Sequence, residues 1–174
     1  SVIENNNSAP FVRVGTNDKL HIKKALDAGA KGIIVPMINT VRDARNAIES
    51  TYYYPKGKRG VGLTKASNFG YNFDKYVKKE SQRIKLILQI ESIEGINNLE
   101  KILDLKNITG TLLGPYDLSA SLGIIGQLEN TLVKNAIKKY EKVSKNKKIS
   151  MGIHIAEPNV SKIKIAQKKK YKFI

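Results

Sequence analysis

The chain has 174 residues, of which 31 are lysine or arginine and 15 are aspartate or glutamate, so its formal charge is +16. It contains no cysteine, which excludes disulfide bridges and thiolate metal sites. No apolar run approaches the roughly 20 residues that a membrane helix needs, and no signal-peptide pattern opens the chain. With 41% hydrophobic residues we expect one domain over residues 1–174, soluble and cytoplasmic, with no membrane partner.

The excess of positive charge is concentrated near the C-terminus, in residues 138–148 and 162–173. Such an excess is typical of proteins that bind nucleic acids or membranes. Here the lysines alternate with apolar helix or strand positions, and neither an aromatic-interleaved RNA motif nor a zinc finger accompanies them. We therefore interpret them as a solvated surface and expect no nucleic-acid partner.

Short apolar runs alternate with helical patterns along the chain. Strands are predicted at residues 11–14, 32–37, 84–91, 108–114 and 149–155, with a further strand beginning at 171–174. Apolar residues at helical spacing follow the first five runs, at residues 18–28, 41–48, 93–103, 128–146 and 159–169. Thr40 is a predicted N-cap for the second of these helices.

Residues 51–80 interrupt this alternation, and we call them the Tyr-rich excursion. The segment is rich in glycine, tyrosine and lysine and has no clean period. Long excursions in compact domains tend to be functional loops, so we expect it beside a binding site.

Strands separated by single helices indicate parallel pairing through right-handed crossovers, in an α/β fold. A β/α barrel and an open doubly wound sheet both fit, but no G-x-G-x-x-G follows any strand, which disfavours the dinucleotide-binding sheet. Polar residues lie at or beyond the predicted strand ends, where barrel enzymes keep their chemistry. The predicted strands are six, fewer than the eight of a closed (β/α)8 TIM barrel, so either the barrel is partial or the architecture is a different one.

Two carboxylates lie at or just beyond the ends of consecutive predicted strands. Glu91 ends the run "QIE", and Asp117 follows the turn "GPYD". Neighbouring parallel strands lie about 4.8 Å apart, so the two side chains can converge on a divalent cation such as Mg or Mn. Spacing alone leaves the alternatives open: Glu91 as an acid beside a helix N-terminus, and Asp117 as a helix N-cap.

Arg13 stands inside the otherwise apolar strand "FVRV". An arginine buried there requires a partner, either an anionic ligand or a carboxylate in a buried salt bridge. Asp27 is a candidate for that carboxylate. Both interpretations stay open at this level.

The segments "VRV…LDAGAKGIIVPMINTVRDAR", "YYYPKGKRGVG", "QIES…NNLEKIL" and "LLGPYDLSASLG" occur in this order. Together they closely resemble the HpcH/HpaI aldolase family, class II pyruvate aldolases that include 4-hydroxy-2-oxoheptanedioate and 2-dehydro-3-deoxyglucarate aldolases. The resemblance covers essentially the whole chain. It implies a barrel of the phosphoenolpyruvate/pyruvate type, present here without its first two strands and its C-terminal end.

The resemblance also implies an activity: retro-aldol cleavage of a 4-hydroxy-2-keto acid to pyruvate and an aldehyde, in the catabolism of carbohydrate acids or aromatic compounds. Its cofactor is a divalent metal cation, Mg, Mn or Co. The full-length protein is implied to form a homo-oligomer, commonly a hexamer, and the Tyr-rich excursion is implied to line the aldehyde pocket.

Residue by residue, the resemblance implies that Glu91 and Asp117 are the metal ligands and that Gln89 contacts the substrate. The backbone amides of Tyr116 and Asp117 are implied to receive the pyruvate carboxylate at the start of a short helix, where amides favour anions.

Arg13 matches the arginine that stabilises the developing enolate, and Asp27 matches the acid that raises the basicity of the catalytic histidine. In the family that histidine lies upstream of the arginine. His21 and His154 do not match it, so we expect the base to lie before residue 1. On this interpretation the 174-residue chain alone is inactive and poorly folded.

Two rival functions fit parts of the pattern. One is a lyase acting on malyl- or citryl-type CoA thioesters, which resembles the family in its barrel and its paired carboxylates. The other is an inactive barrel fragment acting as a basic binding module. The motifs "GPYDLSASLG" and "RGVG" favour the aldolase.

Overall fold

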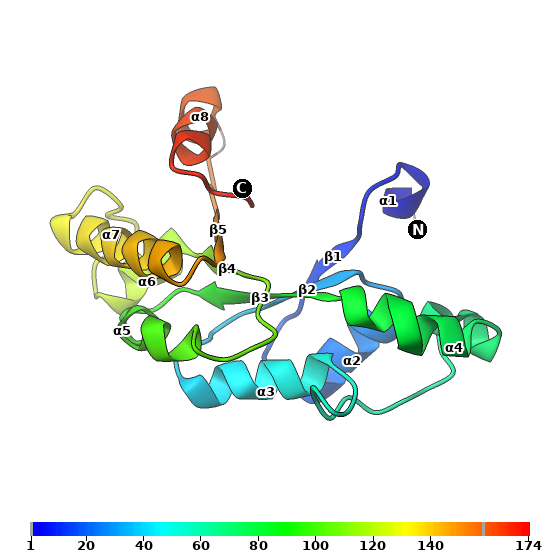
Figure 1. Cartoon of the computed structure of the whole chain (residues 1–174). Coiled ribbons are helices and arrows are strands. Elements are labelled where there is room, and N and C mark those ends of the chain that lie inside the picture. Colours follow the sequence, from blue (N-terminus) through cyan, green and yellow to red (C-terminus); the bar gives the residue numbers. More distant parts are fainter. Residues whose placement is uncertain (1, 158) are drawn as a thin grey trace.

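A five-stranded parallel sheet forms the centre of the protein (Figure 1). It is seen in a computed structural model that describes residues 2–157 and 159–174. The strands pair in chain order and are β1 (Phe11–Arg13), β2 (Gly32–Val35), β3 (Lys85–Ile90), β4 (Gly110–Leu113) and β5 (Ser150–Ile153). The predicted α/β class and the parallel pairing are confirmed.

The strand predicted to begin at 171–174 is reduced to a single bridge. Phe173 pairs with Gly152 of β5, and the Ile153 amide donates to the Phe173 carbonyl over 3.1 Å. The Lys172 amide also donates to the Met151 carbonyl over 2.7 Å, so the last residues follow β5 without forming a full strand. Within the described residues the sheet stays an open arc.

Five helices follow the five strands as the apolar spacing predicts, and all five begin at a side-chain N-cap. They are α2 (Lys19–Asp27), α3 (Val41–Thr51), α5 (Ile93–Ile102), α7 (Thr131–Asn146) and α8 (Val160–Lys168). Their caps are Asp18, Thr40, Ser92, Asn130 and Asn159. None of the described helices has the length and apolar character needed to cross a membrane.

Short helical turns account for the segments that lack a clean period. The Tyr-rich excursion carries η1 (Lys65–Gly70) and α4 (Phe73–Lys75), and its last residues form the π-helical turn η2 (Tyr76–Glu80), which leads into η3 (Ser81–Arg83). Two further elements are the turn α1 (Val2–Asn5) and the helix α6 (Pro115–Ser121). The excursion is therefore more ordered than a plain loop.

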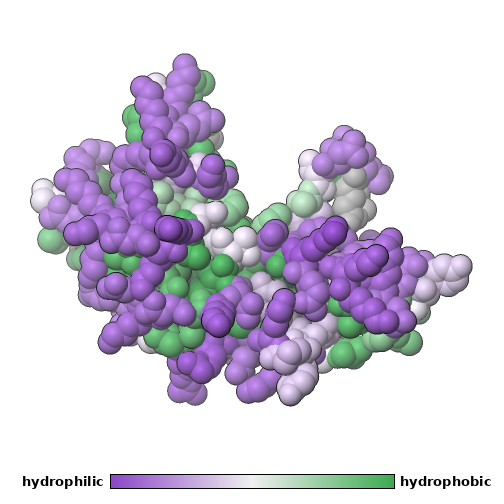
Figure 2. Space-filling model, viewed as in Figure 1, coloured by the Kyte–Doolittle hydropathy of each residue, from purple (hydrophilic) through white to green (hydrophobic). Residues whose placement is uncertain are grey.

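The helices α2, α3, α5 and α7 cover the outer side of the curved sheet, whereas the inner side faces the space between α1 and α8 (Figure 1). Side chains alternate across a strand, so in β3 Leu86, Leu88 and Ile90 pack toward the helices and are fully buried. Gln89, of the opposite parity, belongs to the inner side. Hydrophilic residues dominate α8 and the region of α4, while hydrophobic ones gather toward the middle of the visible face (Figure 2).

Tyr140 ties α7 to the sheet. Its ring is fully buried, and its hydroxyl lies 2.8 Å from the Thr111 hydroxyl and 3.1 Å from the carbonyls of Thr111 and Gly152. Burial raises the pKa of Tyr140, so the phenol stays neutral across the physiological range. One hydroxyl thus joins β4, β5 and α7.

We predict that Tyr140→Phe lowers the free energy of unfolding by about 1–3 kcal/mol, because the buried Thr111 hydroxyl loses its partner. Chemical denaturation followed by circular dichroism measures this change. Tyr71→Phe is the control, since Tyr71 is 89% exposed and should change stability by less than about 0.5 kcal/mol. Equal stability of the two variants would contradict the assignment.

Candidate active site

The candidate site lies at the C-terminal edge of the sheet, where β3 and β4 end side by side. Ile90 pairs with Leu113, and one residue further the Gly114 amide donates to the Ile90 carbonyl over 3.1 Å. This bond carries the pairing beyond the strands. It places Glu91 directly beside the turn that starts α6.

The Glu91 side chain is buried at this edge, with 3% of the residue exposed. One carboxylate oxygen, Oε1, accepts a 2.7 Å hydrogen bond from the Met37 amide. The other, Oε2, accepts from the Gln89 side-chain amide. Met37 lies beyond the end of β2 with a φ of 55°, an uncommon conformation for a residue other than glycine. The Glu91 carboxylate is therefore held from both sides.

Gly114 leaves a space that both carboxylates face. A Cβ atom at Gly114 would lie 3.0 Å from Glu91 Cβ, 3.2 Å from Glu91 Oε2 and 3.6 Å from Asp117 Oδ2. The Glu91 and Asp117 carboxylate oxygens thus both lie within 3.6 Å of one point, which a side chain at position 114 would crowd.

This environment disfavours the negative charge of Glu91. Burial raises the pKa of the Glu91 carboxyl above its usual range, and the nearby charge of Asp117 raises it further. The Met37 amide acts in the opposite direction, because its hydrogen bond favours the ionised form. A cation between the carboxylates would relieve the repulsion.

Asp117 is not the N-cap of α6, so that alternative is wrong. Gly114 occupies the cap position without a side-chain hydrogen bond, and Pro115 is the first helical residue. Proline favours this position because its φ suits a helix and it has no amide hydrogen to satisfy. Asp117 therefore lies in the first turn, is exposed, and is free to point toward Glu91.

The first-turn amides of α6 have no acceptor within the helix, because no turn precedes them. Two of these amides belong to Tyr116 and Asp117, the pair that the resemblance assigns to a substrate carboxylate. The hydroxyls of Ser119 and Ser121 hold the helix in place: Ser119 Oγ accepts from the Gly126 amide at 2.9 Å, and Ser121 Oγ accepts from the Ile93 amide at 2.9 Å.

Arg13 reaches the same cluster from β1. Its Nε donates to Gln89 Oε1 over 3.5 Å, a long bond that links β1 to the Gln89–Glu91 pair. The expectation of a buried arginine is wrong: Arg13 is exposed, because β1 is the edge strand of the described sheet. Among the described residues no ion pair joins it to Asp27.

Asp27 lies at the other end of α2, where the helix leads back to the start of β2. Its carboxylate pairs with Arg59 Nη2 at 2.7 Å and also with Lys23. The Arg59 side chain is fully buried, 4.7 Å from the centre of the Tyr53 ring and within 3.2 Å of the Tyr76 hydroxyl. The structure thus brings Arg13, Gln89, Glu91, Tyr116 and Asp117 together but leaves Asp27 apart.

Sequence reasoning missed the Arg59 cluster. The only signal was the motif "RGVG", which Arg59 opens within a segment that has no regular period. Neither histidine joins the candidate site through a side-chain contact. His21 is exposed on α2 and pairs with Asp18 at 3.1 Å, as expected for an outward-facing residue. His154 follows β5, is exposed, and is positioned through its backbone amide, which donates to the Leu113 carbonyl over 2.9 Å.

The donor set suits a hard divalent cation. Carboxylate oxygens are the protein ligands that Mg and Mn prefer. In the described part of the chain no group of three histidine, aspartate or glutamate side chains could surround an ion. Glu91 and Asp117 would therefore supply two ligands and leave the remaining positions to water or substrate, as Mg sites commonly do.

Comparison with known proteins decides the family. The sequence model of the HpcH/HpaI aldolase/citrate lyase family matches residues 2–167. The chain belongs to this family. A 4-hydroxy-2-oxo-heptane-1,7-dioate aldolase from Escherichia coli is 36% identical over 157 residues, which cover 89% of this chain and 60% of the relative. The chain thus spans about 60% of the length of that curated HpcH/HpaI relative.

Solved structures of HpcH/HpaI proteins share the fold. A family member from Burkholderia cenocepacia superposes with a TM-score of 0.89 at 31% identity, covering 96% of this chain and 66% of that one. A citrate lyase β subunit from M. tuberculosis, solved with oxaloacetate and magnesium, matches with a TM-score of 0.60 at 11% identity, over 94% and 65% of the chains. At 11% identity, the similarity to the citrate lyase β subunit shows a shared fold only.

We predict that Asp117→Asn lowers the pKa of Glu91, because removal of the neighbouring negative charge makes the ionised form easier to reach. Titration of the Glu91 side-chain carbonyl carbon by NMR, without added metal, measures the shift. Asp104→Asn is the control, since Asp104 is exposed and pairs with Lys147. An unchanged Glu91 titration in Asp117→Asn would show that the two carboxylates do not share a site.

Proposed function

We propose that the protein containing this chain is a divalent-cation-dependent aldolase that cleaves a 4-hydroxy-2-keto acid to pyruvate and an aldehyde. The observation that carries the proposal is the convergence of Glu91 and Asp117 on the space at Gly114. Family membership and the E. coli aldolase relative support the reaction class. We infer further that the open sheet is part of a (β/α)8 barrel, whose strand ends are the usual place for such a site.

Glu91 and Asp117 are the residues that would hold the cation, which we propose to be Mg, Mn or Co. When bound, the cation supplies Lewis acidity to the carboxylate and keto oxygens of the substrate. The magnesium in the M. tuberculosis citrate lyase, which shares the fold, supports this choice. Met37 and Gln89 keep the Glu91 carboxylate oriented for this task.

The residues around the cation position the substrate. In the proposal the amides of Tyr116 and Asp117 bind the carboxylate of the 2-keto acid, since both point out of the first turn of α6. The Gln89 side chain contacts the substrate, and Arg13 lies beside it, where its positive charge stabilises an enolate oxygen. The Tyr-rich excursion contributes a wall to the aldehyde pocket.

Cleavage requires the proton of the 4-hydroxyl to leave as the C3–C4 bond breaks. The bonding electrons pass to the pyruvate enolate, which is then protonated at C3 to give pyruvate, and the aldehyde forms at C4. By the resemblance, the base is a histidine before residue 1, and Asp27 is the acid that raises its basicity. Within this chain Asp27 is held by Arg59 and Lys23, so its proposed role requires a histidine brought to that position.

We also propose a homo-oligomer for the intact protein.

A second candidate is a lyase for malyl- or citryl-type CoA thioesters, because the family also includes citrate lyases. Both reactions use a retro-aldol step at a pair of carboxylates, so the site alone does not separate them. The 36% identity to a heptanedioate aldolase favours the free 2-keto acid as substrate.

The function is tested with the protein expressed from its full reading frame. We expect pyruvate release from 4-hydroxy-2-oxoheptanedioate in a lactate-dehydrogenase-coupled assay with Mg or Mn, and at least a hundredfold loss on EDTA treatment or in Glu91→Ala. Glu100→Ala, on the exposed side of α5, is the control and should keep full activity. Turnover that survives EDTA would refute the role of the cation, and turnover confined to citryl-CoA would favour the second candidate.

Gly114 provides a separate test. We predict that Gly114→Ala displaces the Glu91 carboxylate, because the new methyl group would lie 3.0 Å from Glu91 Cβ. The displacement needed is a few tenths of an ångström, and since a misplacement of about 1 Å costs about a hundredfold in activity, we expect a loss of about threefold. In wild type, Mg at a hundredfold excess over its Kd should stabilise the fold by about 2.7 kcal/mol, and the variant should keep only part of this gain. Gly15→Ala is the control, since its new methyl group would meet nothing within 4 Å.

A further inference from the structure

A second cleft lies where α7 and α8 end against the start of β5. Its volume is about 480 Å³, and its walls include the β5 residues Ser150 and Met151. Its remaining lining is almost entirely basic. We call it the lysine cleft, and its lysines are Lys145, Lys148, Lys168, Lys169, Lys170 and Lys172.

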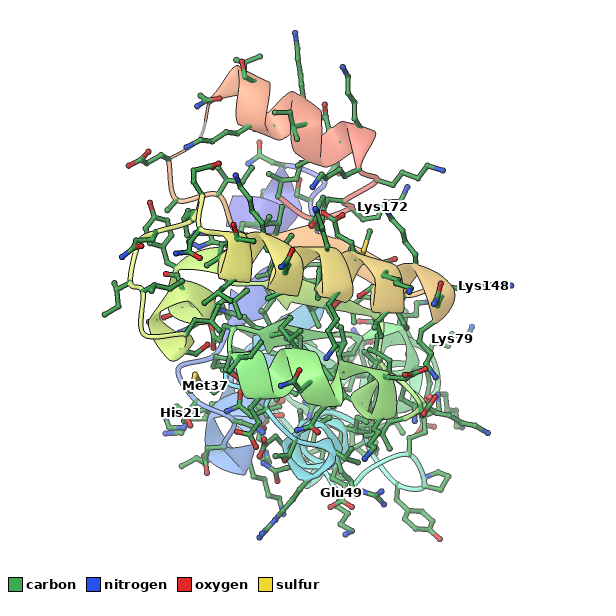
Figure 3. The ribbon with its side chains drawn as sticks, turned by 90° about the vertical axis from the view of Figure 1, so that its left-hand side faces the viewer. His21, Met37, Glu49, Lys79, Lys148 and Lys172 are labelled. Atoms are coloured by element: carbon green, nitrogen blue, oxygen red, sulfur yellow. The ribbon has the colours of Figure 1, made fainter. Side chains whose placement is uncertain are left out.

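The lysine cleft belongs to the N-terminal edge of the sheet, opposite the candidate active site. Lys148 precedes β5, and Lys172 precedes the bridge residue Phe173. In Figure 3, Lys148 and Lys172 project on one side of the molecule, and Met37, whose amide binds Glu91, lies on the other. The cleft is therefore separate from the proposed aldolase chemistry.

Acidic residues do not balance the charge of this cleft. Lys169 pairs with Glu141 at 2.9 Å, but within residues 2–157 and 159–174 the other five lysines form no ion pair. A basic cleft near the start of β2 differs, because it contains Glu80, which pairs with Lys31 and Lys75. Five lysines with no carboxylate partner in the described part of the chain thus line one cleft.

The backbone gives an independent observation. Lys148 and Lys170 follow the C-caps of α7 and α8 with φ values of 55° and 66°. Glycine is the residue that this left-handed position favours, and α2 ends in that way at Gly29, with a φ of 105°. At two helix ends the chain therefore carries a lysine where glycine fits with less strain, and both lysines line the same cleft.

Stabilisation of the helix ends does not account for this charge. The C-terminus of a helix carries about half a negative charge, so two helix ends offset about one of the five positive charges. The remaining positive charges repel one another, and a bound anion would reduce this repulsion. Lysine ammonium groups on flexible stems suit phosphate groups, which they bind as point charges from several directions.

We propose that the lysine cleft binds a small anion carrying two or more phosphate groups, either an inorganic oligophosphate or the phosphate chain of a nucleotide. The size of the cleft and the convergence of lysines from two helix ends favour a compact anion. No aromatic side chain lines it, so it offers no platform on which nucleic-acid bases would stack.

The test is isothermal titration calorimetry of the protein expressed from its full reading frame, with inorganic triphosphate and with ATP, at fixed ionic strength. Lys148→Gly and Lys170→Gly should each weaken triphosphate binding by about threefold, and together by about tenfold. Their unfolding midpoints should hold or rise, because glycine suits the positive φ. Lys138→Gln/Lys142→Gln, which removes two exposed α7 lysines outside the cleft, is the charge-matched control and should leave binding unchanged.

The outcomes are separable. Triphosphate and ATP binding with equal affinity identifies the phosphate chain as the ligand, and tighter ATP binding identifies a nucleotide. The proposal is overturned if the control double variant weakens binding as much as the cleft variants, since binding would then follow net charge alone. It is also overturned if a uridine 12-mer binds while triphosphate does not, which would indicate a nucleic-acid surface.

Discussion

The backbone hydrogen bond from Gly114 to the Ile90 carbonyl is the contact on which the candidate active site depends. It extends the β3–β4 pairing by one residue and so places Glu91 beside the turn that begins α6. Glu91 follows the end of β3 and Asp117 lies in the helix that follows β4, and the pairing of the two strands brings these ends together. The regular distance between parallel strands thus sets the distance between Glu91 and Asp117, the two proposed ligands. Gly114 leaves space beside both carboxylates.

The sequence predicts the parts of the fold that local chemistry decides. Apolar runs locate the strands, and a polar residue such as Thr40 marks a helix start, because an N-cap side chain binds a backbone amide only two or three residues further along the chain. The paired carboxylates were found for a similar reason: in parallel strands of consecutive order, the positions just past the strand ends become neighbours. The start of α6 could also have been read from Pro115, whose ring favours the first helical position.

Long-range pairing accounts for what the sequence did not predict. Arg59 joins Asp27 across 32 positions, and no local pattern identifies either partner. The exposure of Arg13 depends on the number of strands beside β1, which its own residues do not encode. Met37 likewise combines a positive φ with a hydrogen bond to Glu91, a partner 54 positions away along the chain.

The buried Arg59 cluster has a consequence for how the protein tolerates change. Arg59 pairs with Asp27 of α2 and also contacts the Tyr53 and Tyr76 rings, so it joins the beginning and the end of the Tyr-rich excursion to one point on α2. Between these anchors the exposed side chains of Leu63, Phe69 and Tyr71 contribute little to the core. The entropy of closing a loop grows only slowly with its length, so residues can be inserted between the anchors at small cost. Homologous proteins can therefore differ in the length of this segment while the anchors keep their places.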